Sequence, residues 1–476
     1  MTEVRENKMG SAPVQWLLLT MSAPMVISML VMALYNVVDS IFVALISEDA
    51  LAAVSLAFPI QSLMVALGIG MSVGMSVVLS KSLGEKNFPQ VHKVASNGLF
   101  ISVLIYLLFM LFGVFGSNWL LRTQTDIAGI VDGGTSYLSI VCIGSLGIFL
   151  EFTLERMLIS TGKTIYPMIT QIVGAVINAV FDPILIFGLF GFPKFGIAGA
   201  AISTIASEFC AAGLALFFNL KYNHEVRLSI KKMLPDWKII KKICAVGLPS
   251  VAMQSVVSVM VYGMNAILFM FSSTAVVVFG VYFKLQSFVF MPAYGLNNGM
   301  MPIVAYNRGA KKYKRIIKTA KHSFLYVIII MATGTLIFQL LPERLMMLFN
   351  ATPDMLRLGV TAIRILGIGF IFAGVSIIIM SILQALGHSL RSMAISFLRM
   401  LIIPLPVVWF LAQRGDVNLV WWGFPIAEVV SVMLAVFLMR KQWRIIKAKH
   451  ENTENNKNNE KRMLHAASGQ VELLEH

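Results

Sequence analysis

A carboxylate at the end of a long apolar stretch is the first feature of this sequence that could do chemistry. Asp39 follows residues 24–38, which are mostly apolar and begin with Pro24. A charge at membrane depth is costly, so a carboxylate there is typical of an ion or proton pathway. Asn36 lies about one helical turn before Asp39 and shares its face, and Pro24 offers a hinge. The alternative is that Asp39 only caps a helix end near the membrane surface.

A second pair of polar residues, an amide and a carboxylate, lies beside a proline in another apolar segment. Asn178 and Asp182 are four residues apart, so their side chains share one face of a helix. Pro183 follows at once, which disfavours α geometry at Asp182 and leaves the carbonyl of Ala179 without its helical partner. We expect a hinge at Pro183 and a cation or proton site beside it. The alternative is a kinked helix with a satisfied Asp182 near its outer end.

Further ionisable residues lie within apolar segments, and the sequence leaves their roles open. They are Glu151, Glu208, Lys284, Arg364, Arg399 and Glu428. The three basic residues are expected to pair with Glu428 or to extend along apolar surface to the membrane interface. Glu208 and Glu428 are expected to brace their helix bundles, although either could line a cleft.

The composition places these residues in a membrane. Of 476 residues, 58% are hydrophobic and 13% are charged, and the mean hydropathy of +0.81 excludes an ordinary soluble globular chain. Apolar runs long enough to cross a bilayer, about 20 residues, recur along the whole chain. We therefore expect an all-α integral membrane protein with twelve transmembrane helices in two pseudo-symmetric six-helix bundles. The predicted spans are residues 14–43, 50–79, 93–116, 128–158, 164–190, 196–220, 240–271, 275–305, 319–341, 355–385, 389–411 and 417–440.

The distribution of Lys and Arg predicts the orientation of the chain. Twenty of these residues lie in or beside one alternate set of loops, and five lie in the other set. By the positive-inside rule, the rich loops and both termini are cytoplasmic. The net charge of +15 then reflects topology and contact with anionic lipid, and no nucleic-acid partner is expected.

An internal repeat with a constant offset divides the chain into two halves. The matching pairs include Pro24 with Pro249, Gly70 with Gly295, Gly84 with Gly309, Lys86 with Lys311 and Gly162 with Gly387. Six helices in each half give both halves the same orientation, and such parallel repeats are one architecture of secondary transporters. The predicted parts are a cytoplasmic tail (1–13), a first bundle (14–221), a cytoplasmic linker (222–239), a second bundle (240–441) and a disordered tail (442–476).

The two halves differ in their acidic residues. The offset of the repeat places Met264 opposite Asp39 and Val407 opposite Asp182, so ion coupling is expected in the first half. A passive channel would lack this asymmetry. A membrane enzyme fits less well, because all seven histidines lie in loops, helix ends or tails and leave no intramembrane metal cluster.

Five motifs carry a family resemblance that extends over about residues 14–440. The strongest is residues 292–310, Pro-Ala-Tyr-Gly-Leu-Asn-Asn-Gly-Met-Met-Pro-Ile-Val-Ala-Tyr-Asn-Arg-Gly-Ala. The others are residues 34–39, 83–86, 178–183 and 196–201. Together they make the sequence similar to the multidrug and toxic compound extrusion (MATE) transporters, in the branch grouped with DinF- and MepA-like proteins.

The resemblance implies two bundles around a central cleft and drug export driven by proton or sodium antiport. It matches Asp39, Asn178 and Asp182 to the acidic cluster of the family's first bundle. Tyr137 and Thr204 match weaker polar positions there, and Asn36 joins them as a secondary polar residue. For these secondary positions a structural hydrogen bond is the alternative.

We therefore predict a secondary active multidrug efflux transporter, and not an enzyme, that exports amphiphilic, often cationic compounds by antiport through alternating access. No cofactor is expected besides the coupling ion, H⁺ or Na⁺, and Na⁺ would bind at Asp39, Asn178 and Asp182. The expected partners are small-molecule drugs and the lipid bilayer. A monomer in the bacterial cell membrane, with both termini cytoplasmic, is expected. The alternative is a flippase or exporter of a lipid-linked or endogenous metabolite in the same superfamily.

Overall fold

A computed structural model describes residues 6–228 and 235–472, apart from the side chains of residues 36–41, 44 and 456–472. Ten of the described helices are long and apolar enough to cross a membrane. Two bent helix pairs supply one further span each, which gives twelve. The predicted all-α fold with twelve spans is thereby confirmed.

The first half contains six spans. They are α2 (Val14–Ala44), α3 (Glu48–Gly84), α4 (Phe88–Phe115), the pair α6 (Ala128–Gly144) and α7 (Leu146–Ser160), α8 (Ile165–Phe187) and α9 (Ile197–Tyr222). The second half repeats this order. Its spans are α10 (Trp237–Phe269), α11 (Ser273–Gly309), α12 (Tyr313–Leu340), the pair α14 (Pro353–Gly367) and α15 (Phe370–Ala385), α16 (Ser389–Phe397) with η3 (Leu398–Ile402) and α17 (Pro404–Ala412), and α18 (Val417–Trp421) with α19 (Gly423–Glu472). Short helices lie outside the spans: α1 (Lys8–Ser11), α5 (Ser117–Arg122) and α13 (Pro342–Met347).

Two spans that the sequence predicted as continuous helices are bent. Helices α6 and α7 meet at Ser145 at an angle of 42°, and α14 and α15 meet at 45° across Ile368 and Gly369. Gly144 and Gly369 occupy equivalent positions of the repeat. Glycine and serine permit such a kink, so the same break recurs in both halves.

Close packing between the halves depends on equivalent glycines. Among the described helices, the most extensive packing is that of α3 against α10 and of α2 against α11. Gly84 lies against the backbone carbonyl of Tyr306, and Gly309 lies against that of Lys81, so a Cβ on either glycine would overlap an oxygen atom. Lys81 and Tyr306 are also equivalent in the repeat, so each contact is the counterpart of the other. The repeat in the sequence therefore corresponds to a two-fold pseudo-symmetric interface.

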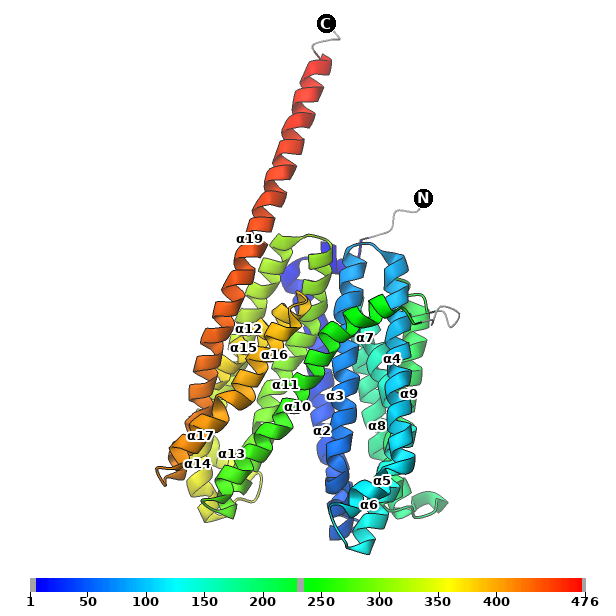
Figure 1. Cartoon of the computed structure of the whole chain (residues 1–476), viewed down its shortest axis with the longest axis vertical. Coiled ribbons are helices and arrows are strands. Elements are labelled where there is room, and N and C mark those ends of the chain that lie inside the picture. The colour runs from blue at the N-terminus through cyan, green and yellow to red at the C-terminus, as the bar shows by residue number, and fades with distance from the viewer. Residues whose placement is uncertain (1–5, 229–234, 473–476) are drawn as a thin grey trace.

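The two ends of the molecule differ in how closely the halves approach. Figure 1 shows both termini at one end, together with the turns between α3 and α4 and between α11 and α12. We call this the terminal end. Helices α3 and α10 lie close together there and diverge toward the opposite end, where α5, α6 and α13 lie (Figure 1).

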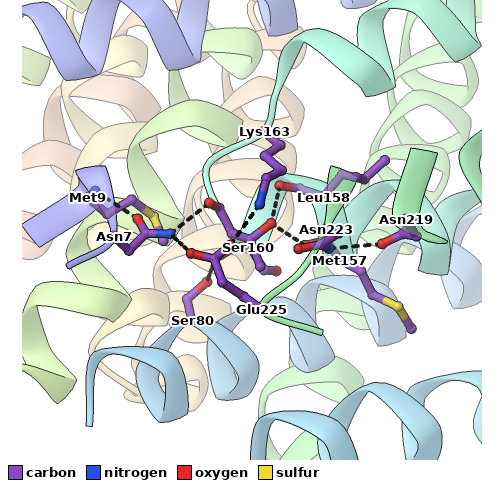
Figure 2. Close-up of polar contacts among 11 residues, drawn as sticks. Asn7, Met9, Ser80, Met157, Leu158, Ser160, Lys163, Asn219, Asn223 and Glu225 are labelled. Carbon is purple, nitrogen blue, oxygen red and sulfur yellow. Dashed lines mark hydrogen bonds and ion pairs between the residues drawn. The ribbon is translucent and has the colours of Figure 1, made fainter. Parts of the chain in front are cut away.

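The segment before α2 packs against the first half, whereas the sequence predicted only a tail. Asn7 caps α1 and donates from Nδ2 to the backbone carbonyl oxygen of Thr161 at 3.0 Å and to the carboxylate of Glu225 (Figure 2). Glu225 in turn pairs with Lys163 at 2.8 Å between Oε2 and Nζ (Figure 2). We call residues 6–12 the N-terminal clasp.

The clasp also contacts the second half. Asn307 of α11 donates to the carbonyl oxygen of Met9 at 2.9 Å, and both residues are fully buried. Arg315 of α12 donates to the carbonyl oxygen of Ala12 at 2.6 Å. The clasp thus joins the two halves at the terminal end through bonds between residues far apart in the sequence.

The C-terminal segment is a helix, whereas the sequence predicted disorder from residue 442. Helix α19 runs from its span to Glu472 and extends beyond the other helices (Figure 1). A helix that continues from an existing span needs no new nucleation, which lowers the cost of ordering polar residues. Lys314 of α12 also pairs with Glu454 at 3.3 Å, which is a contact between the first part of the extension and the bundle.

Candidate ion-coupling site in the first half

Two neighbouring helices, α8 and α9, build the polar site around Asn178 and Asp182. Helix α8 packs along both α9 and α2. Asn178 and Asp182 lie one turn apart on α8, and both side chains are 0% exposed. Hydrocarbon offers no water, so a buried amide and carboxylate must find their partners inside the bundle.

The side chain of Asn178 connects Asp182 to α9. With its amide nitrogen toward Asp182, Asn178 donates to Oδ2 of Asp182 at 2.7 Å and accepts from the backbone N–H of Thr204 at 3.3 Å. Ser203 donates from Oγ to the backbone carbonyl of Asn178 at 3.3 Å. The structure thus brings Asn178, Asp182 and Thr204 together in one polar group.

The other sequence-predicted polar residues lie on α2 and α6. Asp39 and Asn36 belong to α2, which packs along α8, but their side chains lie outside the described part of the chain. Tyr137 on α6 is 4% exposed, and its hydroxyl accepts a hydrogen bond from Nε2 of Gln61 at 2.9 Å. This bond joins α6 to α3.

Pro24 and Pro183, the two predicted hinges, lie inside continuous helices. Pro24 is in α2, and Pro183 is in α8. The expected departure from α geometry at Asp182 is wrong, because α8 stays helical there and continues to Phe187. Packing against α2 and α9 outweighs the local preference of a residue before proline. Since proline has no N–H, the carbonyl of Ala179 still lacks its usual helical donor.

A second group of buried carboxylates lies on α7. Glu151 and Glu155 are four residues apart, and each is 7% exposed. Gln171 of α8 donates from Nε2 to both, at 3.0 Å to Glu151 and 3.1 Å to Oε2 of Glu155. Thr170 also donates to Glu155. Gln171 is two turns, about 10 Å, from Asn178 on the same helix, so both groups of carboxylates contact α8.

The sequence left the role of Glu151 open, predicted that Glu208 braces its bundle or lines a cleft, and did not single out Glu155. A signal was present, because two glutamates four residues apart in an apolar segment share a helix face. Glu208 lies half-buried on α9. Arg156, next to Glu155, donates to Oδ1 of Asn298 on α11 at 3.1 Å and so reaches across to the second half.

The second half pairs its buried charges internally. Arg399, 3% exposed, lies in the π-helical segment, and its Nε is 2.8 Å from each carboxylate oxygen of Glu428 on α19. Lys284 and Arg364 are exposed, so Arg399 is the partner of Glu428 within the described residues. No group of three or more His, Cys, Asp or Glu side chains that could hold a metal ion occurs in the part of the chain that the structure describes.

Similarity to known proteins extends over both halves of the chain. The family model MatE matches residues 24–184 and 249–410, two stretches that begin at equivalent prolines of the repeat, Pro24 and Pro249. The multidrug export protein MepA of Staphylococcus haemolyticus is 26% identical, over 88% of this chain and 91% of the relative. A FAD transporter of Shewanella oneidensis is 25% identical, over 93% of this chain and 98% of the relative.

The fold is shared with solved transporter structures. One, described as the outward-facing conformation of a multidrug resistance MATE family transporter, aligns with a TM-score of 0.88 and 21% identity. The alignment covers 94% of this chain and 99% of the other. Since the family model also matches most of each half, the chain belongs to the MATE family of transporters.

Proposed function

We propose that this protein is a secondary active multidrug efflux transporter that exports amphiphilic, often cationic compounds in exchange for H⁺ or Na⁺. The observation that carries the proposal is a fully buried carboxylate, Asp182, bonded to the amide of Asn178 in a membrane helix. The names of the relatives support the class of cargo. The Lys and Arg distribution supports cytoplasmic termini, and we infer a monomer in the bacterial cell membrane.

The coupling step follows from the cost of a buried charge. A carboxylate away from water favours any state in which a proton or a cation removes its charge. When Asp182 takes up a proton, its oxygen becomes a weaker acceptor for Asn178. Asn178 also contacts the backbone of Thr204, so the change is transmitted from α8 to α9. With Na⁺, the oxygens of Asn178 and Asp182, together with Asp39, would serve as ligands.

Alternating access requires two halves that meet at one end and part at the other. The glycine contacts and the N-terminal clasp hold the halves together at the terminal end, while α3 and α10 diverge toward the opposite end (Figure 1). With cytoplasmic termini, this state faces outward. Inward opening then needs the clasp to release at least one half, with Pro24 and Pro183 as the hinges. A proton that moves inward gains about 2.3 kcal/mol per 100 mV, enough for about a 50-fold concentration gradient of a neutral cargo. One-for-one exchange of a proton for a monovalent cation moves no net charge, so the pH gradient drives it.

The test is ion-driven efflux from proteoliposomes that contain the purified full-length chain and ethidium. A pH step and a Na⁺ step are applied separately, in the absence of ATP. Inward movement of one of the two ions should accelerate ethidium efflux above that of protein-free vesicles. If neither step changes the rate, the antiport proposal is wrong.

A second candidate is export of an endogenous dinucleotide, which the FAD transporter among the relatives suggests. An anionic cargo needs a basic partner, and Arg156, which reaches Asn298 across the halves, is a suitable group. Transport of FAD and ethidium should be compared in the same vesicles. Loss of FAD transport in Arg156→Gln, with ethidium transport retained, would favour this candidate. FAD transport at the rate of empty vesicles would exclude it.

A further inference from the structure

A groove of about 380 Å³ lies between α12, α15 and α19 in the second half, away from the carboxylates described above. Its apolar part is formed by Phe324 of α12, Val375 of α15 and Val436 of α19. All three helices belong to membrane spans, so an occupant of this groove would lie alongside lipid.

Helix α19 changes from apolar to basic along the groove. After Val436, the lining residues on this helix include Arg440, Trp443, Arg444 and Lys447. The three cations recur at intervals of four and three residues, so they share one helix face over about 10 Å. Trp443 lies among them, and tryptophan is enriched at the level where hydrocarbon meets the lipid headgroups.

None of the three cations is paired with a carboxylate that the structure describes. Arg440, Arg444 and Lys447 are exposed, and none of them forms an ion pair or hydrogen bond with a residue that the structure describes. The neighbouring Lys314 differs, because it pairs with Glu454 at 3.3 Å. Three like charges that line one groove attract an anion, and guanidinium groups bind phosphate with two parallel hydrogen bonds.

We propose that this groove is a binding site for an anionic phospholipid from the leaflet at the terminal end. The phosphate group contacts the three cations of α19, and an acyl chain lies over Phe324 and Val375. Basic pockets between membrane helices on the cytoplasmic side are suited to such headgroups. The lipid would hold the base of the long α19 extension against α12 and α15.

The experiment is native mass spectrometry of the purified full-length protein in neutral detergent with equal amounts of phosphatidylglycerol and phosphatidylcholine. The variant R440Q/R444Q/K447Q removes the three cations of the groove. The matched control K238Q/K241Q/K242Q removes three exposed cations at the start of α10, at the same end of the molecule. Val375→Trp fills the apolar part without a change of charge. Size-exclusion profiles and thermal unfolding verify that each variant is folded.

The wild type and the α10 variant should retain phosphatidylglycerol in preference to phosphatidylcholine. The groove variant should bind phosphatidylglycerol about 100-fold more weakly, since three basic residues near a lipid headgroup are lost. Val375→Trp should weaken retention of both lipids. Glycerol 3-phosphate in excess should not displace the lipid, because it lacks acyl chains. Wild-type retention by the groove variant, equal losses in both triple variants, unchanged binding in Val375→Trp, or full displacement by glycerol 3-phosphate would each overturn the proposal.

Discussion

Helices α8 and α9 correspond to the two helical segments that hold Arg399 and Glu428 in the second half. Both pairs of helices bury a carboxylate, but its partner differs. In the first half, Asp182 is bonded to the amide of Asn178. In the second half, Arg399 bonds both oxygens of Glu428. A guanidinium that bonds a carboxylate supplies its counter-charge, whereas an amide leaves the charge of the carboxylate uncompensated. In the proposed mechanism, the same pair of helices therefore serves ion coupling in the first half and stability in the second.

The backbones of the two halves are far more alike than their buried charged side chains. Gly84 and Gly309 make equivalent contacts with the opposite half. Lys86 and Lys311, also equivalent, both adopt the left-handed region, with φ of 56° and 55°. Packing between the halves requires matching backbones, but the proposed ion coupling requires a carboxylate in one half alone.

The largest effect on stability is expected from breaking the ion pair of the second half. Arg399→Leu should lower the free energy of unfolding by about 3–5 kcal/mol, because Glu428 is left without its partner. The double variant R399L/E428L should recover most of this loss. Thermal unfolding in detergent measures both, and exposed Arg364→Leu is the control. If the single and double variants are equally stable, the pair has no structural role.

Substitution of either of the two equivalent glycines, Gly84 or Gly309, should lower the stability of the protein by the same amount. Gly84→Ala and Gly309→Ala should each destabilise the protein by about 1–3 kcal/mol, because the added methyl group overlaps a backbone carbonyl of the other half. Gly213→Ala is the matched control, since no heavy atom lies within 4 Å of its added Cβ. It should be neutral or stabilising by up to about 1 kcal/mol. Strongly unequal effects at Gly84 and Gly309 would contradict a symmetric interface.

The sequence predicted the spans because each one is imposed locally, and it predicted the repeat because equivalent residues recur at one constant offset. The thickness of the bilayer sets the length of each apolar run, and every backbone polar group must be satisfied within a helix. The family motifs and the shared face of Asn178 and Asp182 were accessible for the same reason.

Features that depend on contacts between distant residues were missed. Gln171 approaches Glu155 from another helix, and Asn307 meets Met9 from the far half. Neither contact has a pattern in the sequence. The helical geometry at Asp182 was also missed, since packing outweighs a local preference there. The sequence predicted disorder for the α19 extension because its composition is polar. A polar composition does not show that a preceding membrane helix can continue into the segment without new nucleation.

The smallest effect is expected in the N-terminal clasp. Asn7→Ala removes a helix cap and the bonds to Thr161 and Glu225, which should weaken docking of the clasp by about 1 kcal/mol. A cysteine placed at buried Met9, in a background without other cysteines, should then react several-fold faster with a thiol reagent.

The control for this experiment is Asn87→Ala. Asn87 caps α4 in the same way, through the backbone N–H of Gln90 at 3.1 Å, but lies on the exposed surface. It should leave the reactivity at position 9 unchanged. Equal acceleration by both alanine variants would mean that the clasp contacts do not hold the segment in place.

We expect ion coupling to depend on the carboxylate of the first half, and gradient-driven ethidium efflux from proteoliposomes compares that carboxylate with its counterpart in the second half. Asp182→Asn and Glu428→Gln should be compared at equal amounts of folded protein. Asp182→Asn should reduce efflux to the rate of vesicles without a gradient, because its amide cannot take up the ion. Glu428→Gln keeps an oxygen that accepts from Arg399 and should retain the response to the gradient. A full response in Asp182→Asn, with loss in Glu428→Gln, would show that ion coupling depends on the second half instead.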